Sequence, residues 1–365
     1  MSIIEKTNIN TLNILDSLKS FNPAIEDNRP AFFTSAEEEY NALYYGAGLR
    51  VLPKLSLIEL AGNDVLDFLH RITTNNTKEL PKGKLVETVF VSEKGRVLDK
   101  ALLLNLSDKQ ILLCSDTHKH RLQLWIDKYT ISDDVKILTD LSPKAVFGLY
   151  GQQAESFLEW ACSNFTSLEN DSFTVTSVKE LSLILLKTTF NNRPGFYIII
   201  DFIKIKELIS YFLADKGIYD FALVGEDAFS AYKIEQGIVE APNELNDKYN
   251  PYELGLKGLI DFKKGCYIGQ EVIARLDTYD KVQRSLKGIN LPCDFKFRES
   301  LPLAVFNEAG EEAGSLTSVA FSPRHKKNIG LGIIRNSANR NEKYFIKDDT
   351  NKNIEITLTE LPFRK

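Results

Sequence analysis

The hydrophobic and polar positions follow two patterns along the chain. Up to about residue 284, apolar runs such as 196–200 alternate with segments whose apolar residues recur at helical spacing. This alternation predicts the strands and helices of an α+β fold. After about residue 285, short apolar runs are separated by Gly, Pro and Asn, which is typical of a small antiparallel β-barrel or sandwich. We therefore expect a boundary near residues 283–287.

One pattern occurs twice in the first part. Residues 60–69 and 149–158 both fit L-x-G-x-x-(small apolar)-x-x-F-L, and each follows a β-rich run. In each copy a strand would end at a glycine, and the following apolar residues would pack a helix back on the sheet. Between the copies, two apolar runs flank residues 93–96, which contain Gly95 and predict a hairpin turn. The sequence therefore predicts a duplicated α+β core.

Composition and charge narrow the class of protein. The chain is 43% hydrophobic and 26% charged, with a formal net charge of −5, which is typical of a soluble globular protein and predicts neither nucleic acid nor membrane as a partner. Its apolar runs are far shorter than the roughly 20 residues of a membrane helix. The first 20 residues resemble neither a secretory signal nor a transit peptide, so we expect a cytoplasmic protein. The four scattered cysteines include no C-x-x-C pair, so no metal site is predicted.

The segment from Lys264 to Glu271 carries the most specific chemistry. Its spacing predicts a glycine-bracketed turn followed by a helix that starts near Gly269. Cys266 lies close to Lys264 in this turn, and a nearby ammonium group and a helix N-terminus both favour a thiolate. From these residues alone, a buried and inert Cys266 is an equally good interpretation.

These eight residues resemble the K-G-C-[FY]-x-G-Q-E signature of YgfZ-type proteins, a branch of the glycine-cleavage T-protein superfamily. The likeness covers roughly residues 50 to 360. It includes four further stretches. Residues 57–75 resemble L-x-G-x-D-x-x-x-F-L…T-x-N, and residues 95–99 resemble G-[RG]-x-x-D. Residues 250–256 resemble N-P-x-E-x-G-L, and residues 317–332 resemble T-S-x-x-[FY]-S-P…I-G-L-G.

The resemblance implies a fold and a division of the chain. The implied fold is an α+β, three-lobed ring of duplicated β-α units, with a ferredoxin-like folate-binding core and a C-terminal antiparallel β-barrel. Residues 1–50 would be an N-terminal arm, and residues 51–284 would form the core as two lobes, approximately 51–140 and 141–284. Residues 285–365 would form the barrel.

The function implied by the resemblance is that of a folate-binding accessory protein in the assembly or repair of iron–sulfur proteins, and thereby in tRNA modification. Its cofactor would be tetrahydrofolate or a related folate, and its partners would be iron–sulfur client or assembly proteins. One cysteine cannot supply the usual four ligands of a stable cluster, so Cys266 would act through transient ligation or redox exchange.

The resemblance also implies the site residues. Cys266 and Asp99 would be the catalytic residues. The predicted folate-binding residues are Asp99, Asn75, Glu235, Lys264 and Tyr267, and the predicted structural residues of the motif are Gly265, Gly269, Gln270 and Glu271. Arg275 lies one turn beyond Glu271, so an i, i+4 ion pair is expected between them.

Two other functions stay open at this stage. One is the tetrahydrofolate-dependent aminomethyl transfer of true T-proteins, and the other is a non-catalytic scaffold for client proteins. Three departures from the T-protein pattern favour the YgfZ branch: Lys100 stands where a second acid is usual, residues 191–197 contain no acid, and Lys233 replaces an arginine. A lysine lacks the guanidinium fork, so that last change is not conservative.

Overall fold

The computed structural model describes residues 14–139, 142–190, 193–279, 282–293, 295, 301–336, 343–347 and 352–364. The chain forms two compact units. The first consists of residues 1–70, 76–88 and 101–229, and the second of residues 71–75, 89–100 and 230–365. Among the described residues, no helix is long and apolar enough to cross a membrane.

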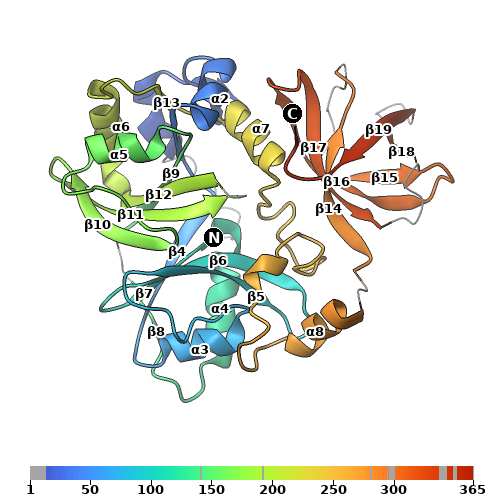
Figure 1. Cartoon of the computed structure of the whole chain (residues 1–365), viewed down its shortest axis with the longest axis horizontal. Coiled ribbons are helices and arrows are strands. Elements are labelled where there is room, and N and C mark those ends of the chain that lie inside the picture. Colours follow the sequence, from blue (N-terminus) through green and yellow to red (C-terminus); the bar gives the residue numbers. More distant parts are fainter. Residues whose placement is uncertain are drawn as a thin grey trace. The chain divides into compact units, whose positions relative to one another are not determined.

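A six-stranded sheet forms the core of the first unit (Figure 1). Its order is β10-β11-β12-β9-β3-β13, and only the pairing of β3 with β13 is parallel. Two helices, α5 and α6, pack apolar side chains on this sheet, in a cluster that includes Phe157, Phe212 and Phe196. The bounds are β3 Ala47–Val51, β9 Lys144–Tyr150, α5 Ala154–Ala161, β10 Ser172–Val178, β11 Leu181–Phe190, β12 Arg193–Asp201, α6 Ile205–Ala214 and β13 Phe221–Leu223.

A second sheet has five strands in the order β5-β6-β7-β4-β8. The hairpin predicted around residues 93–96 is confirmed, because β5 and β6 flank a turn in which Gly95 has a φ of 67°. The bounds are β4 Leu55–Ala61, α3 Val65–Ile72, β5 Leu85–Val91, β6 Val97–Asn105, β7 Gln110–Ser115, η2 Asp116–His118, α4 Lys119–Tyr129 and β8 Lys136–Ile137.

Both copies of the repeated sequence pattern form the predicted strand-turn-helix unit. The first copy runs from β4 into α3, and the second runs from β9 into α5. The glycines between strand and helix, Gly62 and Gly151, have φ values of 134° and 108°, which a residue with a side chain rarely adopts. The repeated sequence pattern therefore corresponds to the same backbone turn in both copies.

The described residues before β3 form regular elements. These include η1 Lys19–Phe21, a hairpin of β1 Ala24–Glu26 and β2 Arg29–Phe32, and α2 Ala36–Tyr44. Ser35 caps α2 by accepting a hydrogen bond from Glu38 N. Because β3 lies inside the six-stranded sheet, this sheet combines residues from the predicted arm with residues of the predicted second lobe. The predicted division at residues 50 and 140 stays a prediction.

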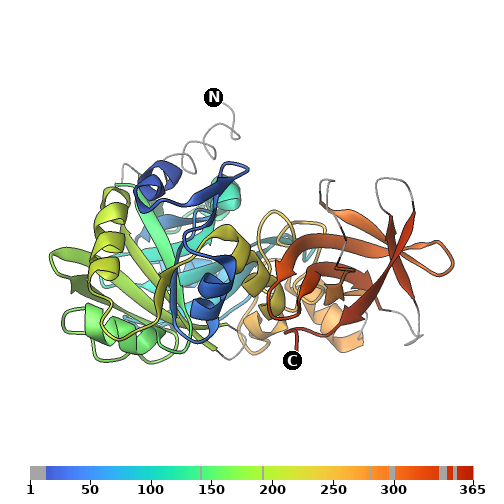
Figure 2. The same ribbon diagram turned by 90° about the horizontal axis from the view of Figure 1, so that it is seen from above.

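The predicted C-terminal barrel is present in the second unit. Its six strands close in the order β14-β17-β16-β15-β18-β19, with antiparallel pairing throughout, and Figure 2 shows these strands in orange to red. The bounds are β14 Arg284–Asn290, β15 Leu303–Asn307, β16 Glu312–Ser322, β17 Lys327–Arg335, β18 Tyr344–Lys347 and β19 Asn353–Thr359.

The rest of the second unit packs on the barrel through two apolar clusters. In one, Ile234 near the end of α7 (Glu226–Gln236) contacts barrel residues such as Leu331. In the other, Tyr267 and the hairpin residues Val91 and Val97 join barrel residue Ile333. The remaining elements are η4 Lys257–Leu259, α8 Gln270–Tyr279 and, in the first unit, η3 Phe202–Lys204. These contacts place the Lys264–Glu271 segment in a packed environment.

Candidate functional site

Main-chain hydrogen bonds fasten the Lys264–Glu271 segment to residues 71–75. Ile268 N donates to Arg71 O at 3.0 Å, and Asp261 N donates to Thr74 O at 3.0 Å. The Thr74 hydroxyl donates to Leu259 O at 2.8 Å. Both ends of the loop are therefore held by one short stretch of chain.

Lys264 is the buried centre of this arrangement. Its Nζ donates to Thr73 O at 2.7 Å and to Asn75 O at 2.8 Å, and it lies 5.0 Å from the centre of the Tyr267 ring. The residue is only 8% exposed. Burial lowers the pKa of Lys264 to about 7, and the Asp261 carboxylate opposes that shift. Two of the predicted folate-binding residues, Asn75 and Tyr267, therefore lie next to a third, Lys264.

Gly269 brings the loop against the β5–β6 turn. Its φ is +79°, and a Cβ at this position would lie 2.5 Å from Ser92 O. Only glycine combines this conformation with such a close approach. Helix α8 begins at the next residue, Gln270. Gly269 is thus required by the backbone, as the sequence predicted for the glycines of the motif.

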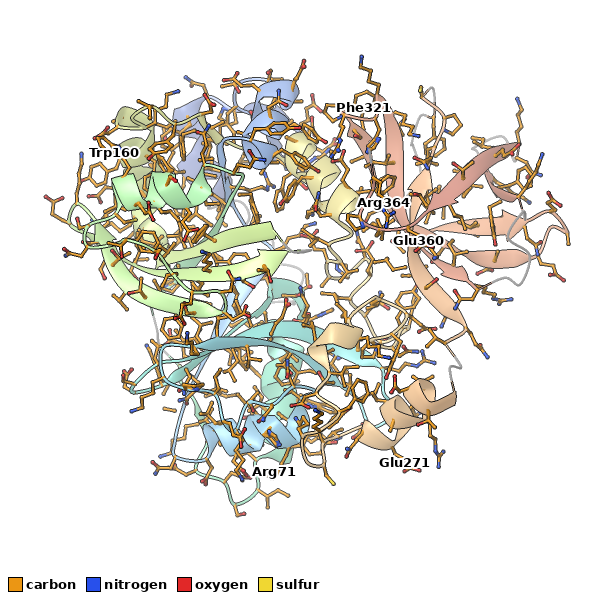
Figure 3. All side chains as sticks on the ribbon, in the orientation of Figure 1. Arg71, Trp160, Glu271, Phe321, Glu360 and Arg364 are labelled. Carbon is orange, nitrogen blue, oxygen red and sulfur yellow. The ribbon has the colours of Figure 1, made fainter. Side chains whose placement is uncertain are left out.

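The polar residues at the start of α8 differ in their surroundings. Gln270 is half-buried, whereas Glu271 is exposed and lies on the outside of the helix (Figure 3). Glu271 forms an ion pair with Arg275 at 2.5 Å, and both side chains are well exposed. The expected i, i+4 pair is therefore present, and it accounts for the position of Glu271 without a ligand.

Cys266 is exposed, in contrast to its neighbours Lys264 and Tyr267. Among the described residues there are four free cysteines, of which Cys114 and Cys162 are buried and Cys293 is the second exposed one. The alternative interpretation of Cys266 as a buried residue is therefore wrong. Its thiol is accessible on a loop whose neighbouring residues are fixed.

Asp99 is fully buried on strand β6. Side chains two residues apart on a strand point to the same face, so Asp99 shares its face with Val97. Val97 packs in the same apolar cluster as Tyr267. The strand therefore brings Asp99 to the face of the hairpin that carries this cluster, and it brings Lys100 to the opposite face.

Glu235 lies near the end of α7 and is held by the barrel. Its Oε1 accepts a hydrogen bond from the Ser322 hydroxyl, and its main-chain O accepts one from Phe363 N at 2.8 Å. The residue is 1% exposed. Nearby, burial lowers the pKa of His325 and the Glu235 carboxylate partly offsets this effect. These contacts give Glu235 a role in attaching α7 to the barrel.

Two of the departures from the T-protein pattern involve Lys233 and residues 191–197. Lys233 forms an ion pair with Glu240 at 2.8 Å, so its charge is engaged within the second unit. Residues 191 and 192 lie outside the described residues, and Arg193 opens strand β12.

Sequence reasoning missed two residues that organise the site. Thr74 accepts a hydrogen bond from Val89 N at 3.1 Å in addition to the bond that it donates. Glu253 is buried, lies 2.9 Å from Arg284 Nε and accepts a hydrogen bond from Asn250 N. Glu253 belongs to the N-P-x-E-x-G-L stretch, so a signal was present. Its role as an internal counter-ion becomes clear only from its partners.

The comparisons with known proteins identify the family. Residues 17–264 match the GCVT N-terminal domain, and residues 290–365 match the glycine cleavage T-protein C-terminal barrel domain. The chain belongs to the glycine cleavage T-protein family. Aminomethyltransferases of this family use tetrahydrofolate.

Several curated relatives span most of the chain. An aminomethyltransferase of Halothermothrix orenii is 24% identical over 311 residues, which cover 84% of this chain and 85% of that protein. A protein of Arabidopsis thaliana whose name marks it as a candidate chloroplastic transferase is 27% identical over 317 residues, or 86% of this chain and 71% of that protein.

The fold of this T-protein family member is also that of a solved relative. The crystal structure of the glycine cleavage system aminomethyltransferase T from Bartonella henselae superposes with a TM-score of 0.80 and covers 96% of both chains. The two sequences are 16% identical. This likeness establishes the fold, namely mixed α+β with a closed six-stranded C-terminal barrel.

Proposed function

We propose that this protein is a folate-binding member of the T-protein family that acts in the assembly or repair of iron–sulfur proteins, as YgfZ-type proteins do, and thereby supports tRNA modification. The observation that carries this proposal is the exposed thiol of Cys266 on a loop fastened through Lys264 and Gly269. A fixed and accessible thiol can bind or exchange with a group on another protein. The YgfZ-like signature around it supports this assignment.

The residues around the hairpin fit the chemistry of a folate. A buried carboxylate such as Asp99 accepts hydrogen bonds from N–H groups of a pterin, and the Tyr267 ring offers an aromatic surface for stacking. Asn75 and Lys264 support the site by bonding to each other. When bound, tetrahydrofolate would supply one-carbon chemistry. The protein would bind it, orient it and limit its contact with water.

Cys266 would act as a transient ligand or in thiol exchange with a client or assembly protein. A substitution that removes only the thiol separates this role from folate binding. In Cys266→Ser we expect unchanged tetrahydrofolate affinity by calorimetry, together with loss of iron–sulfur enzyme activity in cells that depend on this protein. Cys293→Ser is the matched control because Cys293 is the other exposed cysteine, and it should behave as the wild type.

The result of this experiment distinguishes three possibilities. Loss of client activity with intact folate binding supports thiol chemistry. Full client activity in Cys266→Ser would contradict thiol chemistry and would favour a non-catalytic scaffold role. Absence of saturable tetrahydrofolate binding at millimolar ligand in the wild type would contradict the folate part of the proposal.

Aminomethyl transfer is the second candidate, and the names of the curated relatives favour it. It predicts tetrahydrofolate-dependent release of ammonia from an aminomethylated carrier protein. The decisive variant is Asp99→Asn, which keeps the shape of the side chain but removes its charge. If the wild type releases ammonia and Asp99→Asn does not, the transferase function replaces the iron–sulfur function.

A further inference from the structure

A second site is suggested by a pocket in the first unit, whose lining includes none of the candidate site residues above. Its volume is about 280 Å³, close to the lower end of the range for small-molecule sites, about 300–1,000 Å³. Four stretches of chain line it: residues 14–18, 28–33, 50–54 and 223–226.

The walls of the pocket are mainly apolar. They are formed by aliphatic, proline and phenylalanine side chains: Ile14, Leu15, Leu18, Pro30, Phe33, Val51, Pro53, Leu223 and Val224. Binding of an apolar ligand body against such a lining is favourable, because it removes apolar surface from water. The ligand should therefore be largely hydrocarbon.

Cations predominate among the charged residues of the lining. Arg29, Arg50 and Lys54 line the pocket together with a single carboxylate, Glu226. Arg50 is paired with this carboxylate, and both side chains are largely buried. Asp227 lies 3.9 Å from Arg29, but both of those side chains are well exposed, so solvent weakens that pair. The lining therefore favours a negatively charged group.

Arg50 also has spare hydrogen-bonding capacity. Its Nη1 donates to Val224 O at 3.1 Å, whereas its buried Nε has no hydrogen-bond partner among the described residues. An unpaired buried donor costs free energy.

The position of the pocket in the sheet agrees with a binding role. Strands β3 and β13 are parallel, and residues at and just after their carboxyl ends, within 50–54 and 223–226, contribute to the lining. The pocket thus lies beside the carboxyl ends of the one parallel strand pair of this sheet. A fixed frame surrounds this edge, because the buried Glu39 accepts hydrogen bonds from Thr34 N and Gly225 N.

We propose that this pocket binds a small amphipathic carboxylate, with its hydrocarbon body between the apolar walls and its carboxylate beside Arg29 and Lys54. The occupant is a monocarboxylic acid with a medium-length or compact apolar body. This site is independent of the folate site, so its occupancy does not require the function proposed above.

Octanoate is a suitable probe for this pocket, measured by calorimetry on the full chain. We expect saturable binding of one octanoate per chain, at least tenfold tighter than that of octanol, because only the carboxylate interacts with the cations. The double variant Arg29→Glu with Lys54→Glu should weaken octanoate binding by about tenfold or more. The control, Lys82→Glu with Lys136→Glu, makes the same change in net charge at two exposed positions outside the lining.

Each outcome decides the proposal. Saturable octanoate binding that is lost in the first double variant and kept in the second supports it. Equal affinity for octanol and octanoate would overturn the assignment of a carboxylate. Failure of octanoate to bind at millimolar concentration, or binding that both double variants leave unchanged, would overturn the site itself.

Discussion

The loop from Lys264 to Gly269 and the pocket beside Arg50 are built in opposite ways. The loop consists of neighbouring residues and is held mainly through main-chain atoms of residues 71–75. The pocket is formed by side chains from four separate stretches of the first unit. A contiguous site can be recognised as a motif in the sequence. A site assembled from distant segments leaves no such motif.

The two regions also differ in how a charge is buried. The ammonium group of Lys264 donates hydrogen bonds to two main-chain oxygens, those of Thr73 and Asn75. Arg50 is paired directly with Glu226 and lies 5.0 Å from the centre of the Phe229 ring. Removal of one member of a buried ion pair leaves the other charge without compensation, which costs more than the loss of a hydrogen bond.

The largest effect is therefore expected for Arg50→Met. This change leaves Glu226 without its buried partner, and the free energy of unfolding should fall by about 3–5 kcal/mol. Chemical denaturation measures the effect. Arg29→Met is the control, because its longer and exposed pair with Asp227 should contribute less than about 1 kcal/mol. Equal effects of the two variants would show that the Arg50 pair is not effectively buried.

The next effect is expected for Gly269→Ala. The added Cβ would meet Ser92 O at 2.5 Å in a backbone conformation with φ of +79°, so the loop must move away from the hairpin. We expect a loss of about 2–3 kcal/mol in the free energy of unfolding. Gly258→Ala is the matched control, because no atom lies within 4 Å of its Cβ position. A Gly269→Ala protein as stable as this control would contradict the close approach.

A smaller effect is expected for Lys264→Met, which keeps the length of the side chain but removes the ammonium group. The carbonyl oxygens of Thr73 and Asn75 then lose their donor, at a cost of about 2 kcal/mol. Hydrogen exchange of residues 71–75 should increase in parallel. Lys263→Met, at the exposed neighbouring position, should change neither quantity.

The smallest effect is a dependence of stability on pH. Because the pKa of Lys264 is lowered to about 7 in the folded protein from 10.5, the unfolded chain binds more protons between these two values. The free energy of unfolding should therefore rise with pH across this window, by about 1 kcal/mol per pH unit or less. Denaturation of the wild type and of Lys264→Met at pH 7.5 and 8.5 isolates this contribution. An identical pH dependence in both proteins would contradict it.

Several features of the fold could be predicted because they depend on local sequence. The repeated glycines Gly62 and Gly151 mark strand-to-helix turns, and the spacing around Gly95 marks a hairpin, since each reflects a backbone conformation of a few consecutive residues. The change near residue 285 marks the start of the barrel at β14. The place of β3 inside the six-stranded sheet was not predicted, because strand order depends on distant pairing.

The sequence predicted which residues form the candidate site, but it predicted their roles less well. The signature from Lys264 to Glu271 located the loop, and the structural role of Gly269 agrees with its backbone conformation. The sequence alone left Cys266 either buried or exposed, and it assigned Lys264 and Glu235 to a ligand. In the structure their side chains bond to residues 73 and 75 and to the barrel residue Ser322, and their role towards a ligand stays a prediction. Burial and hydrogen-bond partners depend on packing, which local patterns do not specify.

The sequence by itself determined the family, the order of strands and helices in the duplicated units, the C-terminal barrel and the position of the Cys266 loop. Each of these depends on residues that are neighbours in the chain, where steric limits and hydrophobic period act directly. Only the tertiary structure decided that the Cys266 thiol is accessible, that Lys264 and Asp99 are buried, and that a pocket forms beside Arg50. These properties arise when segments far apart in sequence pack together, and the free energy of that packing is set by the whole fold.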